Sequence, residues 1–385
     1  MAYRALALTT VVISDLHLGL RTAADVLRRP AALNVLQRRL EGVERLVLLG
    51  DVLELRHGPL RDALEIAEPV LRALAAALGG GRVVLVPGNH DHAVVAPWLE
   101  RRANQRPAAP LGLEHTIAPG AASETAAALA AALAPADVEV AYPGLWLRDD
   151  VYAIHGHYSD VHSTVPTFER LATGAMARWV VSLPQAGATP DDYEAVLSPL
   201  YAWMHALTQR SDHATLSAGA GASARAWVEL AGSGRRRRPL RAAAFGAGYV
   251  AGVAALNALG VGPIERSLSG AALRRGSLHG MREVLRRLGV SAPYVVWGHS
   301  HRSGPWPRDD RAEWTTPAGT RILNAGSWVY QPHFLTERPN GSPYWPGTAI
   351  ELDDEGPPRL VRLLGERGHD ALKPRVRPAA VRSPA

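Results

Sequence analysis

The chain of 385 residues contains no cysteine, and Lys373 is its only lysine. The lack of cysteine excludes disulfide bonds, thiolate nucleophiles and zinc sites with sulfur ligands. Carboxylate, imidazole and amide groups remain as the side chains that can bind a metal ion. Any metal site in this chain must therefore consist of oxygen and nitrogen ligands.

The N-terminal residues do not have the layout of a secretory signal peptide. Their short apolar run leads directly into Asp15 and His17 rather than into a cleavage site of small residues. We therefore expect residues 6–14 to form the first strand of a cytosolic protein.

Nearly half of the residues, 47%, are apolar, and 20% are charged. Such a chain can bury a large core, and its length suits either one domain with an insertion or two domains. The formal net charge of +6 comes almost entirely from arginine. This charge favours anionic partners, although a genomic base composition that enriches arginine, alanine, glycine and proline also explains it.

The first three strand-like runs, residues 6–14, 45–49 and 82–86, are separated by two segments with helical spacing of apolar residues, 23–40 and 60–78. This alternation predicts an α/β fold with right-handed parallel crossovers. In such a fold the carboxyl ends of the strands share one edge of the sheet. Side chains that follow the strands come together at this edge.

Side chains that can bind a metal or transfer a proton directly follow five strand-like runs. In chain order they are Asp15 and His17, then Asp51, then Asn89, His90 and Asp91, then His155 and His157, and finally His299 and His301. Each of these alone is compatible with an ordinary turn or a buried histidine. Their repetition at the ends of successive strands indicates a metal centre at the edge of a sheet.

The remaining patterns divide the chain. Residues 92–145 predict helices and loops, with the clearest helical spacing at 121–133, and hairpins are predicted at 145–154 and 348–363. We expect one domain, a mostly helical cap inserted into it and a disordered tail. The boundaries are 1–157 and 292–365 for the domain, 158–291 for the cap and 366–385 for the tail.

Five motifs stand in the order found in the calcineurin-like metallophosphoesterases, and the chain resembles that family over residues 1–160 and 290–365. The motifs are Asp15-x-His17, Gly50-Asp51, Gly88-Asn89-His90-Asp91, His155-Gly156-His157 and Gly298-His299-Ser300-His301. The resemblance implies metal-dependent hydrolysis of phosphoesters. It also implies a four-layer αββα sandwich, here with a helical cap insertion.

The same resemblance implies a centre with two divalent metal ions. Asp15, His17 and His301 would bind one ion, Asn89, His155 and His299 would bind the other, and Asp51 would bridge them. With oxygen and imidazole ligands and no thiolate, we expect Mn²⁺, while Fe and Zn remain open.

His90 is not a ligand in this assignment and is left as a proton donor. We expect it to be protonated, to be held by Asp91, and to neutralise the transition state or protonate the leaving oxygen. His155 and His157 compete for one ligand position. The family favours His155, so His157 would support a ligand or face the substrate.

Four further polar residues lie just beyond the motifs. We expect them to be solvated or structural rather than to contact the substrate. They are Arg56, His57, Asp160 and His162.

Residues 242–262 carry no ionised side chain and follow the cationic run Arg235–Arg238. The segment is long enough to span a bilayer. A single crossing would nevertheless separate His299 from Asp15, although both should reach the same metal centre. We therefore expect either a buried cap helix or a helix on a membrane surface. In the second case residues 235–262 would provide a peripheral membrane contact.

Within the family, the variant Gly50-Asp51-Val52-Leu53-Glu54 and the late helical insertion resemble the UDP-2,3-diacylglucosamine pyrophosphatases. This resemblance implies cleavage of a phosphodiester or pyrophosphate bond in an amphiphilic or nucleotide substrate. The alternatives are a nuclease or nucleotide phosphodiesterase, which the basic charge favours, and a non-catalytic membrane-docking scaffold. The full ligand set argues against a scaffold. We expect a cytoplasmic enzyme, with membrane association left open.

Overall fold

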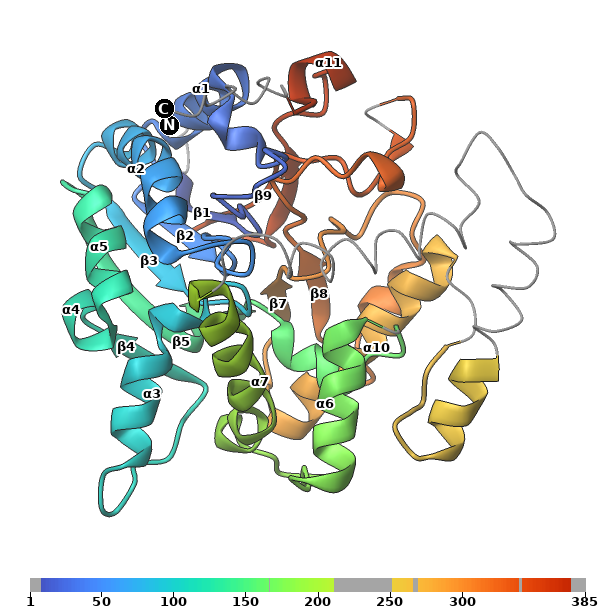
Figure 1. Cartoon of the computed structure of the whole chain (residues 1–385). Helices are drawn as coiled ribbons and strands as arrows, with labels where there is room; N and C mark the ends of the chain where they lie inside the picture. The colour runs from blue at the N-terminus through green and yellow to red at the C-terminus, as the bar shows by residue number, and fades with distance from the viewer. Residues whose placement is uncertain (1–7, 166, 211–250, 266–268, 339–340, 375–385) are drawn as a thin grey trace, which may run out of the picture.

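The computed structural model of the chain describes residues 8–165, 167–210, 251–265, 269–338 and 341–374. Its strands form one ten-stranded sheet in the order β10-β9-β1-β2-β3-β5-β6-β7-β8, with β4 paired to β5 (Figure 1). The strands are β1 (Leu8–Ile13), β2 (Arg45–Leu49), β3 (Arg82–Val86), β4 (Glu114–Ile117), β5 (Asp137–Arg148), β6 (Val151–Ile154), β7 (Tyr294–Trp297), β8 (Arg321–Asn324), β9 (Thr348–Asp353) and β10 (Arg359–Arg362).

The long strand β5 joins two halves of this sheet. Its first residues pair in parallel with β3, and its last residues pair antiparallel with β6. At the change of partner, a Cβ on Gly144 would lie 2.4 Å from the carbonyl oxygen of Ala153, so the close approach of the strands requires glycine. Val84 of β3 and Val296 of β7 belong to one buried cluster, which shows that the inner faces of the two halves pack together.

Helices cover both outer faces of the folded sheet. On the first half, α1 (Pro30–Leu40), α2 (Leu60–Leu78) and α5 (Glu124–Ala132) pack against β1 and β2. On the second half, α7 (Pro190–Arg210) and α10 (Gly270–Leu288) pack against β7 and β8. The predicted α/β fold with four layers, αββα, is therefore confirmed.

Two described helices of the segment 158–291, predicted as a cap, belong to this outer layer. After α6 (Phe168–Trp179), helix α7 buries Val196 against the second half, and α10 buries Val284 there. Strands β6 and β7 are parallel, and such a connection requires a crossover on one face of the sheet. Helix α10 lies in this crossover, so the segment is less separate from the sandwich than its sequence suggests.

Residues 92–145 differ from their prediction of helices and loops. Helices α3 (Ala96–Ala103), α4 (Pro119–Ala122) and α5 are present, but β4 and the first part of β5 lie in the same segment. The four-residue strand β4 is largely solvent-accessible, and Pro143 interrupts the apolar pattern of β5. Both features weaken the periodicity from which a strand is predicted.

The tail also differs in part from its prediction. Helix α11 (His369–Leu372) buries Leu372, and Nδ1 of His369 is hydrogen-bonded to the hydroxyl of Tyr330 at 2.7 Å. The prediction of disorder is therefore wrong for residues 369–372, because their partners are distant in sequence. Residues 375–385 lie outside the described part of the chain.

None of the helices that the structure describes is long and apolar enough to cross a membrane. Of the predicted segment 242–262, residues 251–258 are helical, and residues 242–250 lie outside the described residues, as does Arg235–Arg238. The choice between a buried helix and a membrane-surface helix for this segment therefore stays a prediction.

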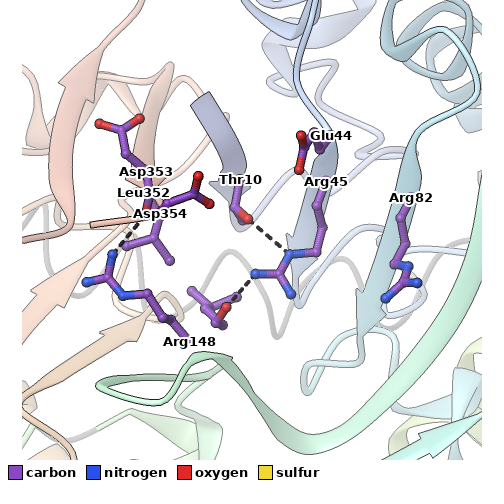
Figure 2. Close-up of a pocket in the computed structure, with 9 residues that line it drawn as sticks. Thr10, Glu44, Arg45, Arg82, Arg148, Leu352, Asp353 and Asp354 are labelled. Carbon is purple, nitrogen blue, oxygen red and sulfur yellow. Dashed lines mark hydrogen bonds between the residues drawn. The ribbon is translucent and has the colours of Figure 1, made fainter. Parts of the chain in front are cut away.

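A polar cavity of about 510 Å³ lies at the amino ends of the parallel strands. Arg45 and Arg82 stand at the first positions of β2 and β3, and Figure 2 shows Arg45 directed at Thr10 of β1. The predicted ligands Asp51 and Asn89 follow the last residues of the same two strands. The cavity is therefore at the edge of the sandwich opposite to the predicted site.

Candidate metal centre

The structure brings the predicted metal ligands together in two groups. The ligand atoms of Asp15, His17 and His301 all lie within 4.8 Å of one another, and so do those of Asp51, His155 and His299. The carboxyl ends of β1, β2, β6 and β7 deliver these residues to one edge of the sandwich. The predicted clustering at strand ends is thus present in the geometry.

Asp51 lies between the two groups. Its Oδ2 atom is 3.6 Å from Nε2 of His17 in the first group and 3.4 Å from Nε2 of His155 in the second. A single carboxylate can therefore face two cations at once. Burial alone would raise the pKa of Asp51, but His155 and His90 lower it well below its usual range.

Asn89 points its amide oxygen into the second group. The oxygen lies 3.3 Å from Nε2 of His155, 3.1 Å from Nδ1 of His299 and 3.2 Å from Oδ2 of Asp51. With its oxygen and nitrogen exchanged, the amide would donate to these three atoms and accept a hydrogen bond from Arg56. The inward oxygen suits a bound cation, whereas the inward nitrogen satisfies the same acceptors with hydrogen bonds.

Three ligand histidines are oriented by a hydrogen bond on the ring nitrogen that faces away from the cluster. Nδ1 of His17 bonds Glu54 at 3.0 Å, Nδ1 of His155 bonds the carbonyl of Leu49 at 2.9 Å, and Nε2 of His299 bonds Asp160 at 2.9 Å. Such a bond fixes the tautomer and leaves the lone pair of the other nitrogen directed inward, as metal ligation requires.

The donor set fits a cation. Oδ2 of Asp15 accepts hydrogen bonds from the Ser14 hydroxyl at 2.6 Å and from the backbone nitrogen of His299 at 2.9 Å, but its buried Oδ1 has no hydrogen-bond partner. That oxygen lies 3.3 Å from Nε2 of His301. A buried, ionised oxygen without a donor is costly, and a divalent ion would satisfy it.

The electrostatics of the second group lead to the same conclusion. Burial alone would lower the pKa of His155, but Asp51 and Asp15 raise it to about 9. A positive charge is therefore favoured among these carboxylates, and a divalent cation supplies one.

The backbone at the site is unusual. Among the residues that the structure describes, six that are not glycine have a positive φ, and all but Ala23 are predicted ligands. The ligands with positive φ are Asp15, His17, Asp51, His299 and His301, at 46–63°. Left-handed backbone of this kind is sparsely populated and concentrates at functional sites.

His90 is held by a different carboxylate from the one predicted. Its Nδ1 lies 2.9 Å from Oε2 of Glu54, whereas Asp91 turns away and accepts hydrogen bonds from the backbone nitrogens of Gly88 and Val52, both at 2.7 Å. The prediction that Asp91 holds His90 is therefore wrong. Asp91 stabilises the loops that carry Asn89 and Asp51.

The protonation predicted for His90 stays a prediction. Burial and the guanidinium of Arg56 lower the pKa of His90, and the negative charges of Glu54 and Asp51 offset this only in part. This direction opposes the predicted charge in the free protein. A bound phosphate would raise the pKa again, because its negative charge stabilises the imidazolium.

His157 does not face a substrate. It is fully buried, its Nε2 lies 3.4 Å from the hydroxyl of Tyr142, and its ring packs against Tyr158 and Tyr201. Its ring centroid is 5.7 Å from that of His155, so it supports the ligand from behind. Of the two histidines that competed for a ligand position, His155 is the one within the cluster.

Sequence reasoning did not assign two carboxylates to the histidines that they orient. Glu54 bonds both His17 and His90, and Asp160 bonds His299. Glu54 stands three residues after Asp51, and Asp160 stands five after His155, so both lie near motifs. Proximity to a motif was the only sequence signal for these two carboxylates. Arg56 and His162 lie equally near motifs, so proximity alone could not single out Glu54 and Asp160.

Residues 8–181 match the family of calcineurin-like phosphoesterases. The match includes five of the seven predicted ligands, while His299 and His301 lie beyond it. No curated protein matches the chain. Among solved structures, the chain is similar to a dimetal phosphatase from Danio rerio, with 13% identity, 93% of this chain and 99% of that chain covered, and a TM-score of 0.33.

Proposed function

We propose that this metal-dependent phosphoesterase, whose residues 8–181 match the calcineurin-like phosphoesterases, hydrolyses a phosphodiester or pyrophosphate bond at a dinuclear centre. The observation that supports this most strongly is Asp51, whose Oδ2 faces both ligand groups. Two bound divalent ions would hold the phosphate and activate a water molecule for in-line attack. Mn²⁺ is our preferred metal, and Fe or Zn suits the same ligands.

The ligand roles follow the two groups. Asp15, His17 and His301 would hold one ion, and Asn89, His155 and His299 would hold the other. Asp51 would be shared.

His90 would act on the leaving group. It is the partly exposed member of the group His17, Glu54 and His90, with 22% of its side chain accessible. Glu54 bonds its Nδ1 atom, so Nε2 is the atom left to give a proton to the leaving oxygen. The carboxylate of Glu54 would stabilise the imidazolium that forms when phosphate binds.

A substrate panel tests this proposal. Protein loaded with Mn²⁺ is expected to hydrolyse a chromogenic phosphodiester or a pyrophosphate-linked substrate, and a chelator should abolish the activity. The panel would include a nucleotide, a phosphodiester, a pyrophosphate-linked lipid and a phosphomonoester, assayed by phosphate or chromophore release. Hydrolysis of the phosphomonoester alone would contradict the proposed bond type.

An amphiphilic substrate is favoured by the surface of the segment 158–291. The exposed large apolar side chains of the described residues all belong to it: Trp179, Val180, Trp203 and Leu259. We call Trp179, Val180 and Leu259 the apolar corner, because the chain segments that carry them meet where Gly260 lies against the side chain of Arg178. Apolar residues beside an arginine suit the surface of an anionic membrane, so we place the enzyme in the cytoplasm with peripheral membrane contact.

Polar substitution of the apolar corner tests the membrane contact. The double variant Trp179→Ser, Leu259→Ser is expected to bind anionic liposomes more weakly and to raise the KM for a pyrophosphate-linked lipid several-fold. The kcat/KM for a small soluble phosphodiester should stay unchanged, since neither Trp179 nor Leu259 is a predicted ligand or takes part in the bonds that orient the ligand histidines. Unchanged liposome binding would favour the alternative, a soluble nucleotide or nucleic-acid substrate.

The same substrate panel tests the two alternative functions. A nuclease or nucleotide phosphodiesterase would suit the net charge of +6. A scaffold without activity is disfavoured because the orienting bonds to His17, His155 and His299 serve ligation and not docking. The closer resemblance to UDP-2,3-diacylglucosamine pyrophosphatases supports the lipid arm of the panel.

A further inference from the structure

A buried carboxylate from the segment 158–291 reaches the back of the metal edge. Glu194 of α7 is 7% exposed, and its carboxylate accepts four hydrogen bonds. Nε2 of His92 donates at 3.1 Å and the hydroxyl of Tyr158 at 2.6 Å, and the hydroxyls of Tyr142 and Ser198 also donate. Burial alone would raise the pKa of Glu194, but the bond from His92 and the charges nearby lower it to about 2.

Two of these donors lie in the short helices that follow loops with predicted ligands. His92 starts η2 (His92–Val94), directly after the loop with Asn89 and His90. Tyr158 lies in η3 (His157–Val161), three residues after His155. One carboxylate of α7 therefore bonds the elements that follow two ligands of the second group.

The third ligand of that group depends on the same short helix. Asp160 belongs to η3, and its Oδ1 bonds Nε2 of His299 at 2.9 Å. Whatever fixes η3 therefore fixes His155 and, through Asp160, also His299.

The first group is held differently. Asp15 is bonded by Ser14 and by the backbone of His299, and His17 is bonded by Glu54. No hydrogen bond joins Asp15 or His17 to α7 among the described residues, although the Thr208 hydroxyl of α7 donates at 2.9 Å to the carbonyl of Leu55, next to Glu54. The two ligand groups thus differ in their dependence on Glu194.

We propose that Glu194 is a positioning residue through which α7 sets the geometry of Asn89, His155 and His299, and so tunes the affinity of the second metal site alone. This inference rests on the proposed dinuclear centre. Helix α7 is then a fixed part of the site. A group that bonds a metal ligand directly is worth about 10–100-fold in metal affinity, and Glu194, which acts one contact further out, is expected at the lower end of that range.

The carboxylate is matched to its surroundings. An ionised carboxylate offers two oxygens and about four acceptor sites, whereas an amide offers one oxygen and brings two donors of its own. Glu194→Gln keeps the size of the side chain but places donors opposite His92 and the two tyrosine hydroxyls. A buried donor without an acceptor costs free energy, and we expect η2 and η3 to move so that this cost falls.

The test is titration of the metal-free Glu194→Gln protein with Mn²⁺ alone, followed by calorimetry and by electron paramagnetic resonance. We expect one of the two binding steps to weaken about tenfold and the spin-coupled pair of ions to form only at higher Mn²⁺. The other step should change by less than about twofold. Asp192→Asn, two positions earlier on α7 and bonded to Thr189, is the matched control and should titrate like the wild type.

The outcomes separate the proposal from its premise. Equal weakening of both steps, or a lowered melting temperature with both steps unchanged, would show that Glu194 only stabilises the fold and would overturn the inference. A wild type that binds a single Mn²⁺ ion would instead refute the dinuclear centre itself. Glu194→Asp, which keeps the charge but shortens the reach, should fall between wild type and Glu194→Gln in the weakened step.

Discussion

The variant His90→Ala is expected to bind two metal ions as tightly as the wild type and to lose activity by about two to four orders of magnitude, the usual contribution of a positioned proton donor. The reason is geometric. His90 lies outside both ligand groups that contain Asp51 or Asp15, and it is bonded to Glu54 at its far nitrogen. Removing the ring should therefore remove proton transfer while leaving the ligands in place.

The measurement is kcat for a chromogenic phosphodiester together with metal content after gel filtration. Substrates whose leaving group is already a good one should lose less activity, because they need less help from an acid. His115→Ala, a histidine of β4 that packs on Trp98, is the matched control. A parallel loss of bound metal would mean that His90 is a ligand and that its role here is wrong.

The variant Asp51→Asn is expected to lose both metal ions at concentrations that saturate the wild type, and to have no measurable activity. The substitution keeps the shape of the side chain, and asparagine tolerates the left-handed backbone of Asp51, whose φ is 52°. Only the charge between His17 and His155 is lost. Since a bridging carboxylate serves both ions, each should bind more weakly by more than about 100-fold.

Calorimetric titration with Mn²⁺ and metal analysis after dialysis would measure this loss. The variant should also lose the increase in melting temperature that Mn²⁺ gives to the wild type, because stabilisation by a ligand grows with the logarithm of its concentration divided by its Kd. Asp149→Asn, at the exposed turn between β5 and β6, is the control. Retention of one tightly bound ion would show that Asp51 belongs to one group only.

The clustering of the predicted ligands could be anticipated from the sequence because the pattern is local. An apolar run predicts a strand, and parallel strands bring the residues after them to one edge. Asp15, Asp51 and His155 each follow such a run directly, and all lie in the cluster. The α/β fold class follows from the same alternation of strands and helices, whereas its four layers are implied by the family resemblance.

The partners of the ligands could not be predicted because they depend on tertiary contacts. Asp91 is adjacent to His90 in sequence, yet its carboxylate bonds the backbone of the loop, and Glu54 from the neighbouring strand end occupies the place beside His90. Glu194 is 102 residues from His92. Sequence spacing contains no information about a contact of that kind.

The left-handed backbone at five of the predicted ligand positions bears on the stability of the fold. Glycine would occupy such a conformation without steric cost, whereas a side chain there costs of order 1 kcal/mol. Substituting glycine at Asp15 or His299 should therefore relax the fold while it removes a ligand. The edge that would bind the ions is thus also a place where the folded chain gives up stability, about 1 kcal/mol at each position, and glycine at these positions would exchange ligand chemistry for a less strained backbone.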